Sequence, residues 1–439
     1  MRLSRFGAKG KAIKPLQARA TMLNQERIMF AFIARQPILD KSKSVFAYEL
    51  LFRDGKSGSY PEHSEEKSKF ITEQFHPLGL DDICGEKKSF ITFSSDTLIS
   101  RFPTNLNPDS VVVELADPTD TSSGLFEACQ HIKQLGFKLA IDDPMMVGSK
   151  HDIFPLIDIV KVDVTKGRFE TIEKQISRYH DANVQLVAEQ VNSQDNFSTC
   201  VDLGFDFFQG YFFSQPEARI LRQLPASKMN VVDLMGESAN ADFDIARISQ
   251  IIERDATLSF LLLKFINNPT INKRYKITSL RHALNYMGEV EIKKFIALLS
   301  LTNLGDEKPL EIIHMSLVRA KFFDLLAERR GLKNNPPISF LVGLFSLLEG
   351  LLDQSMTDIL KQLPLSEEVN DALLGKNVEL NSYMTLVRAF ESALWMNVIK
   401  QAKLLDIDQK QLHVLYNQAI VWGNGVRSAI SSHYPRAIA

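Results

Sequence analysis

Acidic side chains recur at the ends of short apolar segments in the first half of the chain. The clearest case is Asp142-Asp143, which closes the apolar segment GFKLAID. Two carboxylates held side by side raise each other's pKa, because their like charges repel. A bound cation would remove that cost, so the pair is a candidate metal site. A remnant of a site that no longer works is the alternative interpretation of the same pair.

Further polar side chains lie at equivalent positions of neighbouring segments. Those that could do chemistry are Gln36, Glu49, Glu114, Lys161, Asp163, Glu189 and Gln209. Oxygen ligands without a histidine or cysteine suit Mg²⁺, Mn²⁺ or Ca²⁺ and argue against zinc. Two such ions beside a lysine could polarise a phosphodiester and activate a water, and Arg53 could pair with a phosphate. Taken singly, each residue also has an ordinary explanation as a solvated carboxylate or a surface ion pair.

Short apolar segments carry these residues between about 29 and 217. They are FAFIARQPI, VFAYELLF, SFITFS, VVVEL, FKLAID, IVKVDV, VQLVAE and FFQGYFF. Amphipathic stretches such as RFETIEKQISRYHDAN lie between several of them, which is typical of βαβ units and a parallel sheet. Repetition of this pattern favours a closed α/β barrel over an open sheet. The C-terminal ends of the strands of such a barrel meet on one face, where active residues gather.

From about residue 232 the pattern changes to apolar residues at helical spacing, without strand alternation. Prolines after Asn268, Asn335 and Leu363 indicate helix ends. The predicted organisation is a basic, disordered tail over 1–28, a barrel domain over 29–231 with a linker near 215–231, and an all-α domain over 232–439.

Composition and charge narrow the classes of function. Apolar residues make up 45% of the chain and the formal net charge is −2, so no general attraction to nucleic acid or anionic membranes is expected. Three widely spaced cysteines predict neither a disulfide framework nor a zinc site, and favour a cytoplasmic location. No segment approaches the roughly 20 apolar residues of a membrane span. The basic first 28 residues lack the apolar region of a signal peptide, and an arm that contacts nucleic acid or lipid is the alternative for them.

The order of the motifs resembles the EAL domain of bacterial cyclic di-GMP phosphodiesterases, which is a TIM-like barrel. The motifs, in chain order, are QPI, YELLFR, VELAD, LAIDD, KVD, VAEQV and QGYFFSQP. The resemblance implies that ligands of Mg²⁺ or Mn²⁺ are Glu49, Glu114, Asp142, Asp143 and Glu189. It also implies catalytic roles for Lys161, Glu189 and Gln209, and ligand binding by Gln36 and Arg53.

Three departures from the family pattern affect the metal shell and its support. Thr92 stands where the family has a metal-binding asparagine, and Asn192 stands where it has a second glutamate. The family's loop DDFGTG, which orders the second metal and supports the dimer, is DDPMMVG here, so Pro144 removes a backbone donor and Met145-Met146 replace a flexible turn. Because catalysis depends on tight positioning, these changes predict an impaired enzyme, and they leave open whether its pocket binds cyclic di-GMP or binds nothing. An active metal-dependent phosphodiesterase that produces linear pGpG is the alternative.

The helical half resembles an HDOD domain, a relative of the HD phosphohydrolases that lacks their metal motif. Where HD enzymes carry a GLLHDIG-like stretch, this chain has GLFSLLE, with Ser346 and Leu347 in place of the metal-binding pair. No metal and no hydrolysis are therefore expected in this half. An EAL domain followed by an HDOD domain resembles the YuxH-type signalling proteins of bacteria. That resemblance implies a protein partner for the HDOD domain and outputs such as motility, biofilm formation and attachment. A homodimer follows from the resemblance to EAL domains, although the altered loop weakens that implication.

Overall fold

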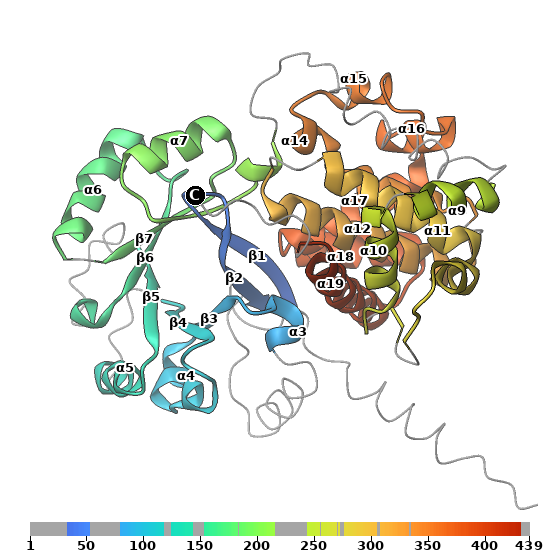
Figure 1. Cartoon of the computed structure of the whole chain (residues 1–439). Coiled ribbons are helices and arrows are strands. Elements are labelled where there is room, and N and C mark those ends of the chain that lie inside the picture. The colour runs from blue at the N-terminus through green and yellow to red at the C-terminus, as the bar shows by residue number, and fades with distance from the viewer. Residues whose placement is uncertain are drawn as a thin grey trace, which may run out of the picture.

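The chain folds into a β-barrel followed by a bundle of helices, and the two lie against each other (Figure 1). The computed structural model describes residues 33–52, 80–117, 124–143, 153–182, 184–215, 244–254, 256–269, 271–272, 276–304, 308–332 and 335–431. The segment that joins the two parts, 216–243, lies outside these residues, as does the basic tail over 1–28. The division at 231 and 232 and the disorder of the tail therefore stay predictions.

Eight strands close the barrel in chain order, which confirms the predicted α/β barrel. They are β1 Ile33–Asp40, β2 Val45–Phe52, β3 Lys88–Phe93, β4 Val111–Leu115, β5 Lys138–Asp142, β6 Ile159–Asp163, β7 Gln185–Glu189 and β8 Phe207–Gln209. The strands from β2 to β8 are parallel, but β1 runs antiparallel to both β2 and β8. The expectation of an entirely parallel barrel is wrong at this point, because only four residues join β1 to β2. A link that short permits a hairpin but not a parallel crossover.

Helices surround the outside of the barrel, as α5, α6 and α7 show in Figure 1. The barrel elements other than strands are α3 Leu80–Cys84, α4 Ser95–Ile99, η2 Phe102–Asn105, α5 Leu125–Gln134, η4 Phe154–Leu156, α6 Phe169–Asp181, α7 Gln194–Asp202 and η5 Phe212–Ser214. The amphipathic stretch expected to be helical corresponds to α6, whose Ile172, Ile176 and Tyr179 are buried. Apolar residues at helical spacing therefore face the sheet, as the sequence predicts.

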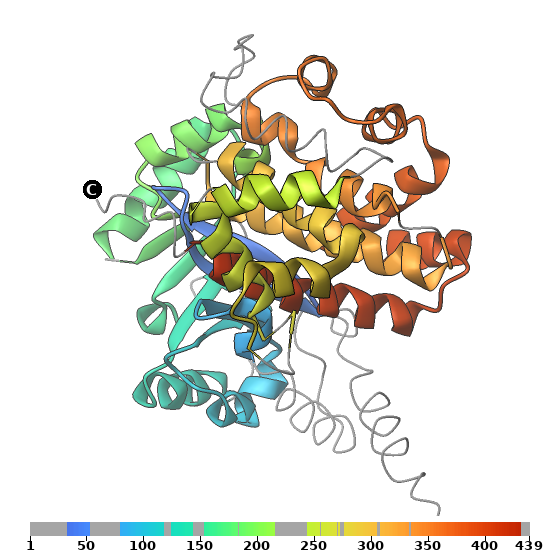
Figure 2. The same ribbon diagram turned by 45° about the vertical axis from the view of Figure 1, so that its right-hand side comes forward.

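The described residues of the second half of the chain form helices joined by loops and no strands, which confirms the predicted all-α class (Figure 2). The helices are α9 Ile245–Arg254, α10 Ala256–Ile266, α11 Leu280–Leu304, α12 Leu310–Arg329, α13 Ile338–Phe345, α14 Leu348–Leu352, α15 Met356–Leu360, α16 Glu367–Leu373, α17 Val378–Glu391, α18 Trp395–Leu405 and α19 Gln409–Ser431. Helix α12 packs against α13 and α19, and most of its residues are buried. Across the parts of the chain that the structure describes, no helix is long and apolar enough to cross a membrane.

Candidate functional site

The interior of the barrel consists of an apolar layer and a polar layer above it. The apolar layer contains Ile38, Ala47, Phe90, Val112, Ala140, Ile159, Val187 and Phe207. Side chains two residues apart on a strand point to the same face, so the next inward positions towards the mouth of the barrel are polar. They are Gln36, Glu49, Thr92, Glu114, Asp142, Lys161, Glu189 and Gln209. Residues that span more than 170 positions of sequence thus converge at one end of the barrel.

Lys161 lies at the centre of the polar layer. Its ammonium nitrogen Nζ is 2.9 Å from Glu49 Oε1, 3.0 Å from Glu114 Oε1 and 2.8 Å from Glu189 Oε1. The Lys161, Glu49 and Glu114 side chains are almost fully buried, whereas that of Glu189 is 21% exposed. Lys161 is the central residue of β6, and it faces inward because it lies two residues after the inward-facing Ile159. We call Lys161 with Glu49, Glu114, Asp142 and Glu189 the acid cluster.

The acid cluster holds more negative charge than its lysine neutralises. Burial, and then repulsion by the other carboxylates, raises the pKa of Glu114 well above its usual value despite the attraction of Lys161. The same causes raise the pKa of Glu189 to about 7. Partial desolvation by the surrounding protein and repulsion by Glu49 also raise the pKa of Asp142, although this residue at the end of β5 is exposed. Burial alone would also raise the pKa of Glu49, but Lys161 and a hydrogen bond from Gln209 lower it below the usual value. The cluster therefore favours a further positive charge or a bound proton.

Two amide side chains join the cluster to the rim of the barrel. Gln209 Nε2 donates hydrogen bonds to Glu49 Oε2 and, at 3.0 Å, to Gln36 Oε1. The sequence pattern predicts Gln36 at a strand end, but the residue lies in the middle of β1. It still reaches the site, because antiparallel pairing places it directly opposite Glu49. The predicted set Gln36, Glu49, Lys161, Glu189 and Gln209 is brought together in this way.

Other predicted site residues point away from the acid cluster or lie outside the residues that the structure describes. Asp143 follows the last residue of β5, so its side chain leaves the barrel interior, and its Oδ1 accepts a hydrogen bond from the hydroxyl of Tyr179 on α6. Thr92 faces the mouth beside Glu114. Arg53 and the loop residues Pro144, Met145 and Met146 lie outside the described residues. The metal-binding and catalytic roles assigned from the sequence stay predictions.

The carboxylate oxygens of the acid cluster are of the chemical type that a hard divalent cation prefers. One of them, Glu114 Oε2, is buried without a hydrogen-bond partner. Within the described ranges, no group of three or more acidic, histidine or cysteine side chains is arranged to hold a metal ion. In the acid cluster, one oxygen each of Glu49, Glu114 and Glu189 contacts Lys161. Glu49, Glu114, Asp142 and Glu189 are the residues that would hold the ion, in exchange for part of their contact with the lysine.

The helical part of the chain forms one wall of the cavity above the acid cluster. The cavity has a volume of about 430 Å³ and is lined from the barrel by Gln36, Glu49, Leu51, Glu189, Gln209 and Tyr211. Its other lining residues include His314, Met315, Val318, Glu391, Leu394 and Tyr416 of the helical part. Ligand sites are frequently found between domains. The lining is mixed, because both the barrel and the helical part contribute polar as well as apolar side chains.

Polar contacts that sequence reasoning did not find hold the two parts together. The guanidinium of Arg35 contacts His314 Nε2 and the Ile83 carbonyl. The Tyr48 hydroxyl donates to Glu311 Oε2 at 2.8 Å. These residues are buried. The two contacts between the parts, Arg35 with His314 and Tyr48 with Glu311, join residues more than 260 positions apart, so no local pattern could have indicated them.

Two family models match the chain in the order of its two structural parts. The model described as EAL domain matches residues 88–216, and the model described as HDOD domain matches residues 224–357. A relative from Vibrio cholerae, "Cyclic di-GMP phosphodiesterase CdgJ", is 31% identical over 92% of this chain and 95% of its own length. The chain belongs to the EAL–HDOD family. Another relative of this EAL–HDOD protein is "Uncharacterized protein YuxH" of Bacillus subtilis, which is 30% identical over 91% of this chain and all of its own length.

Solved structures of EAL proteins resemble part of this EAL–HDOD protein. The crystal structure of an EAL domain protein from Listeria monocytogenes covers 50% of this chain and 98% of its own, with a TM-score of 0.31 and 17% identity. A standalone EAL protein from Vibrio cholerae in its c-di-GMP-bound form covers 42% and 90%, with a TM-score of 0.28 and 20% identity.

Proposed function

We propose that this EAL–HDOD protein is a cyclic di-GMP signalling protein whose barrel binds the nucleotide at its mouth and hydrolyses it poorly. Its HDOD domain presents a helical surface to a protein partner. The observation that carries the proposal is that Gln36, Glu49, Glu189 and Gln209 line one cavity. Lys161 contacts Glu49 and Glu189 and joins them to Glu114, the next carboxylate of the acid cluster. Membership of a family that includes a named cyclic di-GMP phosphodiesterase supports the choice of nucleotide.

The chemistry of the base of the cavity fits a phosphodiester only together with a divalent cation. Glu49, Glu114, Asp142 and Glu189 would repel the two phosphates of cyclic di-GMP, and these are the residues that would hold Mg²⁺ or Mn²⁺. When bound, such an ion polarises a phosphodiester and lowers the pKa of a coordinated water. Gln36 can donate to the ligand from its amide, while Lys161 keeps the carboxylates at fixed positions through its three ion pairs.

Three features weigh against efficient turnover. Glu49, Glu114 and Glu189 are already paired with Lys161, so a metal ion has to compete with a buried ammonium. Thr92 offers a hydroxyl at the position where the family has an asparagine. Asp143 is held by Tyr179 on the outer side of the barrel, away from the cluster. Since small displacements of a reacting group can cost a large part of the rate, slow hydrolysis is expected.

Active hydrolysis to linear pGpG is the second candidate, and two observations favour it. CdgJ carries the name of a phosphodiesterase and aligns with 92% of this chain. The four carboxylates of the acid cluster are all present and converge. The HDOD domain would then regulate an enzyme and not a sensor.

Equilibrium dialysis with Ca²⁺ and chromatography of the nucleotide with Mg²⁺ or Mn²⁺ distinguish these functions. We expect retained, uncleaved cyclic di-GMP, and we expect Glu49→Gln to abolish retention. Glu127→Gln on the exposed face of α5 is the matched control and should bind as the wild type does. Linear product at about one turnover per second or faster, an ordinary enzymatic rate, would establish the second candidate. Absence of binding would contradict both.

A further inference from the structure

The end of helix α17 reaches the barrel beside the acid cluster. The helix stops at Glu391, and the next residues turn back through Ala393, whose φ of 52° is uncommon for a residue other than glycine. The Leu394 amide donates to the Ala389 carbonyl at 2.8 Å, which closes the turn. We call residues 391–394 the α17 turn. Its Glu391, Ser392 and Leu394 all line the cavity above the acid cluster.

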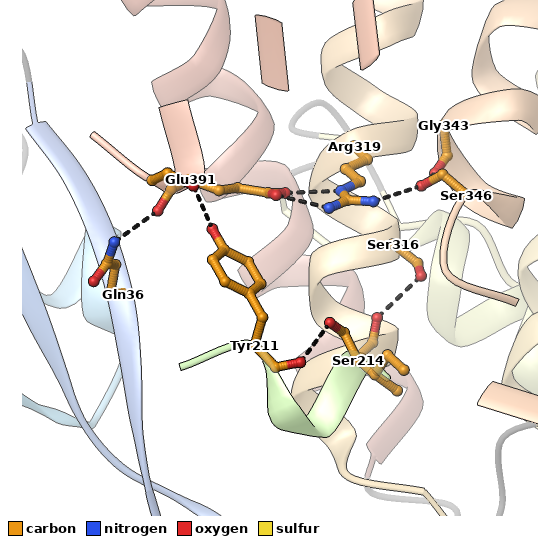
Figure 3. Close-up of polar contacts among 10 residues, drawn as sticks. Gln36, Tyr211, Ser214, Ser316, Arg319, Gly343, Ser346 and Glu391 are labelled. Atoms are coloured by element: carbon orange, nitrogen blue, oxygen red, sulfur yellow. Dashed lines mark hydrogen bonds and ion pairs between the residues drawn. The ribbon is translucent and has the colours of Figure 1, made fainter. Parts of the chain in front are cut away.

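The α17 turn holds two barrel residues that also line this cavity (Figure 3). Gln36 Nε2 donates a hydrogen bond of 3.1 Å to the Glu391 carbonyl oxygen. The hydroxyl of Tyr211, which follows β8 and Gly210, lies 3.1 Å from the Ser392 hydroxyl. Gln36 also accepts from Gln209. The orientation of the Gln36 amide is therefore set from the barrel on one side and from the HDOD domain on the other.

A buried ion pair keeps the α17 turn in place. Arg319 of α12 donates to both carboxylate oxygens of Glu391, with Nε at 2.8 Å and Nη2 at 2.7 Å, and its Nη1 lies 3.1 Å from Ser346 Oγ (Figure 3). Both side chains are less than 10% exposed. Two parallel hydrogen bonds between arginine and a carboxylate restrict the geometry as well as adding energy. The backbone carbonyl that Gln36 contacts is thus attached to the middle of the HDOD domain.

We infer that the α17 turn is part of the nucleotide site, with Ser392 and the Glu391 backbone positioning Tyr211 and Gln36 for cyclic di-GMP. The inference rests on the proposed function and adds a role for the HDOD domain to it. A ligand in the cavity would contact both domains, so binding would hold the domains together. In return, a protein partner that displaces α12 or α17 would weaken binding of the nucleotide. This reciprocity follows from linkage between two binding events.

The decisive experiment measures the affinity of the full-length protein for cyclic di-GMP in Ca²⁺. Ser392→Ala removes the hydroxyl that contacts Tyr211 and should weaken binding about three- to tenfold, as for loss of one hydrogen bond that orders a site. Tyr211→Phe removes the same contact from the other side. The double variant should bind no more weakly than the weaker single variant, because the two changes remove one shared interaction. Ser382→Ala is the matched control, since its hydroxyl contacts only the Val378 carbonyl on the exposed face of the same helix.

Two further readouts separate positioning from a general loss of stability. The thermal midpoint without nucleotide should be the same for Ser392→Ala and Ser382→Ala, while the rise caused by nucleotide should be smaller for Ser392→Ala. In the wild type, nucleotide should slow amide hydrogen exchange in the α17 turn. If the wild type binds the nucleotide, an unchanged affinity of Ser392→Ala would overturn the inference but not the proposed function. Faster amide exchange in the α17 turn of the wild type on binding would do the same. Failure of the wild type to bind would overturn the proposed function and the inference with it.

Discussion

The role of Lys161 as the internal counter-ion of the acid cluster predicts a large effect of Lys161→Met. Methionine has a similar length but no charge, so it leaves Glu49, Glu114 and Glu189 close together without their shared partner. Removal of one member of a buried ion pair typically costs about 3–5 kcal/mol. For a domain of the size of this barrel, about 1 kcal/mol corresponds to a shift of roughly 2–4 °C in the thermal midpoint. The midpoint should therefore fall by roughly 6–20 °C in a buffer with EDTA.

Differential scanning fluorimetry of the full-length protein, with EDTA and with Ca²⁺, measures this effect. Ca²⁺ should raise the midpoint of Lys161→Met more than that of the wild type, because the variant has no ammonium for the ion to displace. Lys133→Met is the matched control. Lys133 pairs with Asp158 at 2.6 Å, but both side chains are about 30% exposed, so a loss of at most about 1 kcal/mol is expected. An equal fall in both variants, or no difference in their response to Ca²⁺, would refute the counter-ion role.

The remaining predictions concern the pH dependence of stability and the contact between the domains. Because the pKa of Glu189 is about 7 in the folded protein against 4.5 ordinarily, its contribution to stability is greatest below pH 4.5 and is lost as the pH rises towards 7. As the pH rises through that window, the free energy of unfolding of Glu189→Gln should increase relative to that of the wild type by up to about 1.4 kcal/mol per pH unit. Thermal midpoints of the two proteins that change in parallel over pH 5, 6, 7 and 8 would contradict this. Gly350→Ala places a Cβ atom 2.2 Å from the Ser214 carbonyl oxygen, so the domains must move apart, at a cost of about 1–3 kcal/mol. Its thermal midpoint should fall and its scattering radius should grow, whereas Gly167→Ala, with 3.9 Å to its nearest neighbour, should leave both unchanged.

The part of the site that could be predicted from the sequence depends on one local rule. Charged or amide residues follow apolar ones within or at the end of the strands, and the alternation of side chains along a strand places them on the inner face. Glu49, Glu114, Lys161, Glu189 and Gln209 converge for that reason. The same rule, applied residue by residue, would have separated Asp142, which faces inward, from Asp143, which faces α6. The adjacency of the two aspartates in the sequence concealed this difference.

The part that could not be predicted depends on contacts between distant residues. The antiparallel direction of β1 follows from the short hairpin before β2, whose length is visible in the sequence. The hydrogen bond between Gln36 and the Glu391 carbonyl joins residues 355 positions apart. It depends on how the HDOD domain packs on the barrel, and helical periodicity carries no information about that packing. Sequence patterns therefore predicted each domain but not the cavity between them.

The most direct test of a metal-dependent nucleotide site between the barrel and the HDOD domain is a calorimetric titration of cyclic di-GMP into the full-length protein, with and without Ca²⁺. We predict saturable binding of one nucleotide per chain in Ca²⁺ and much weaker binding in EDTA, because the carboxylates of the acid cluster repel the phosphates without a cation. No saturable heat in Ca²⁺, or the same affinity in both buffers, would contradict the proposed site.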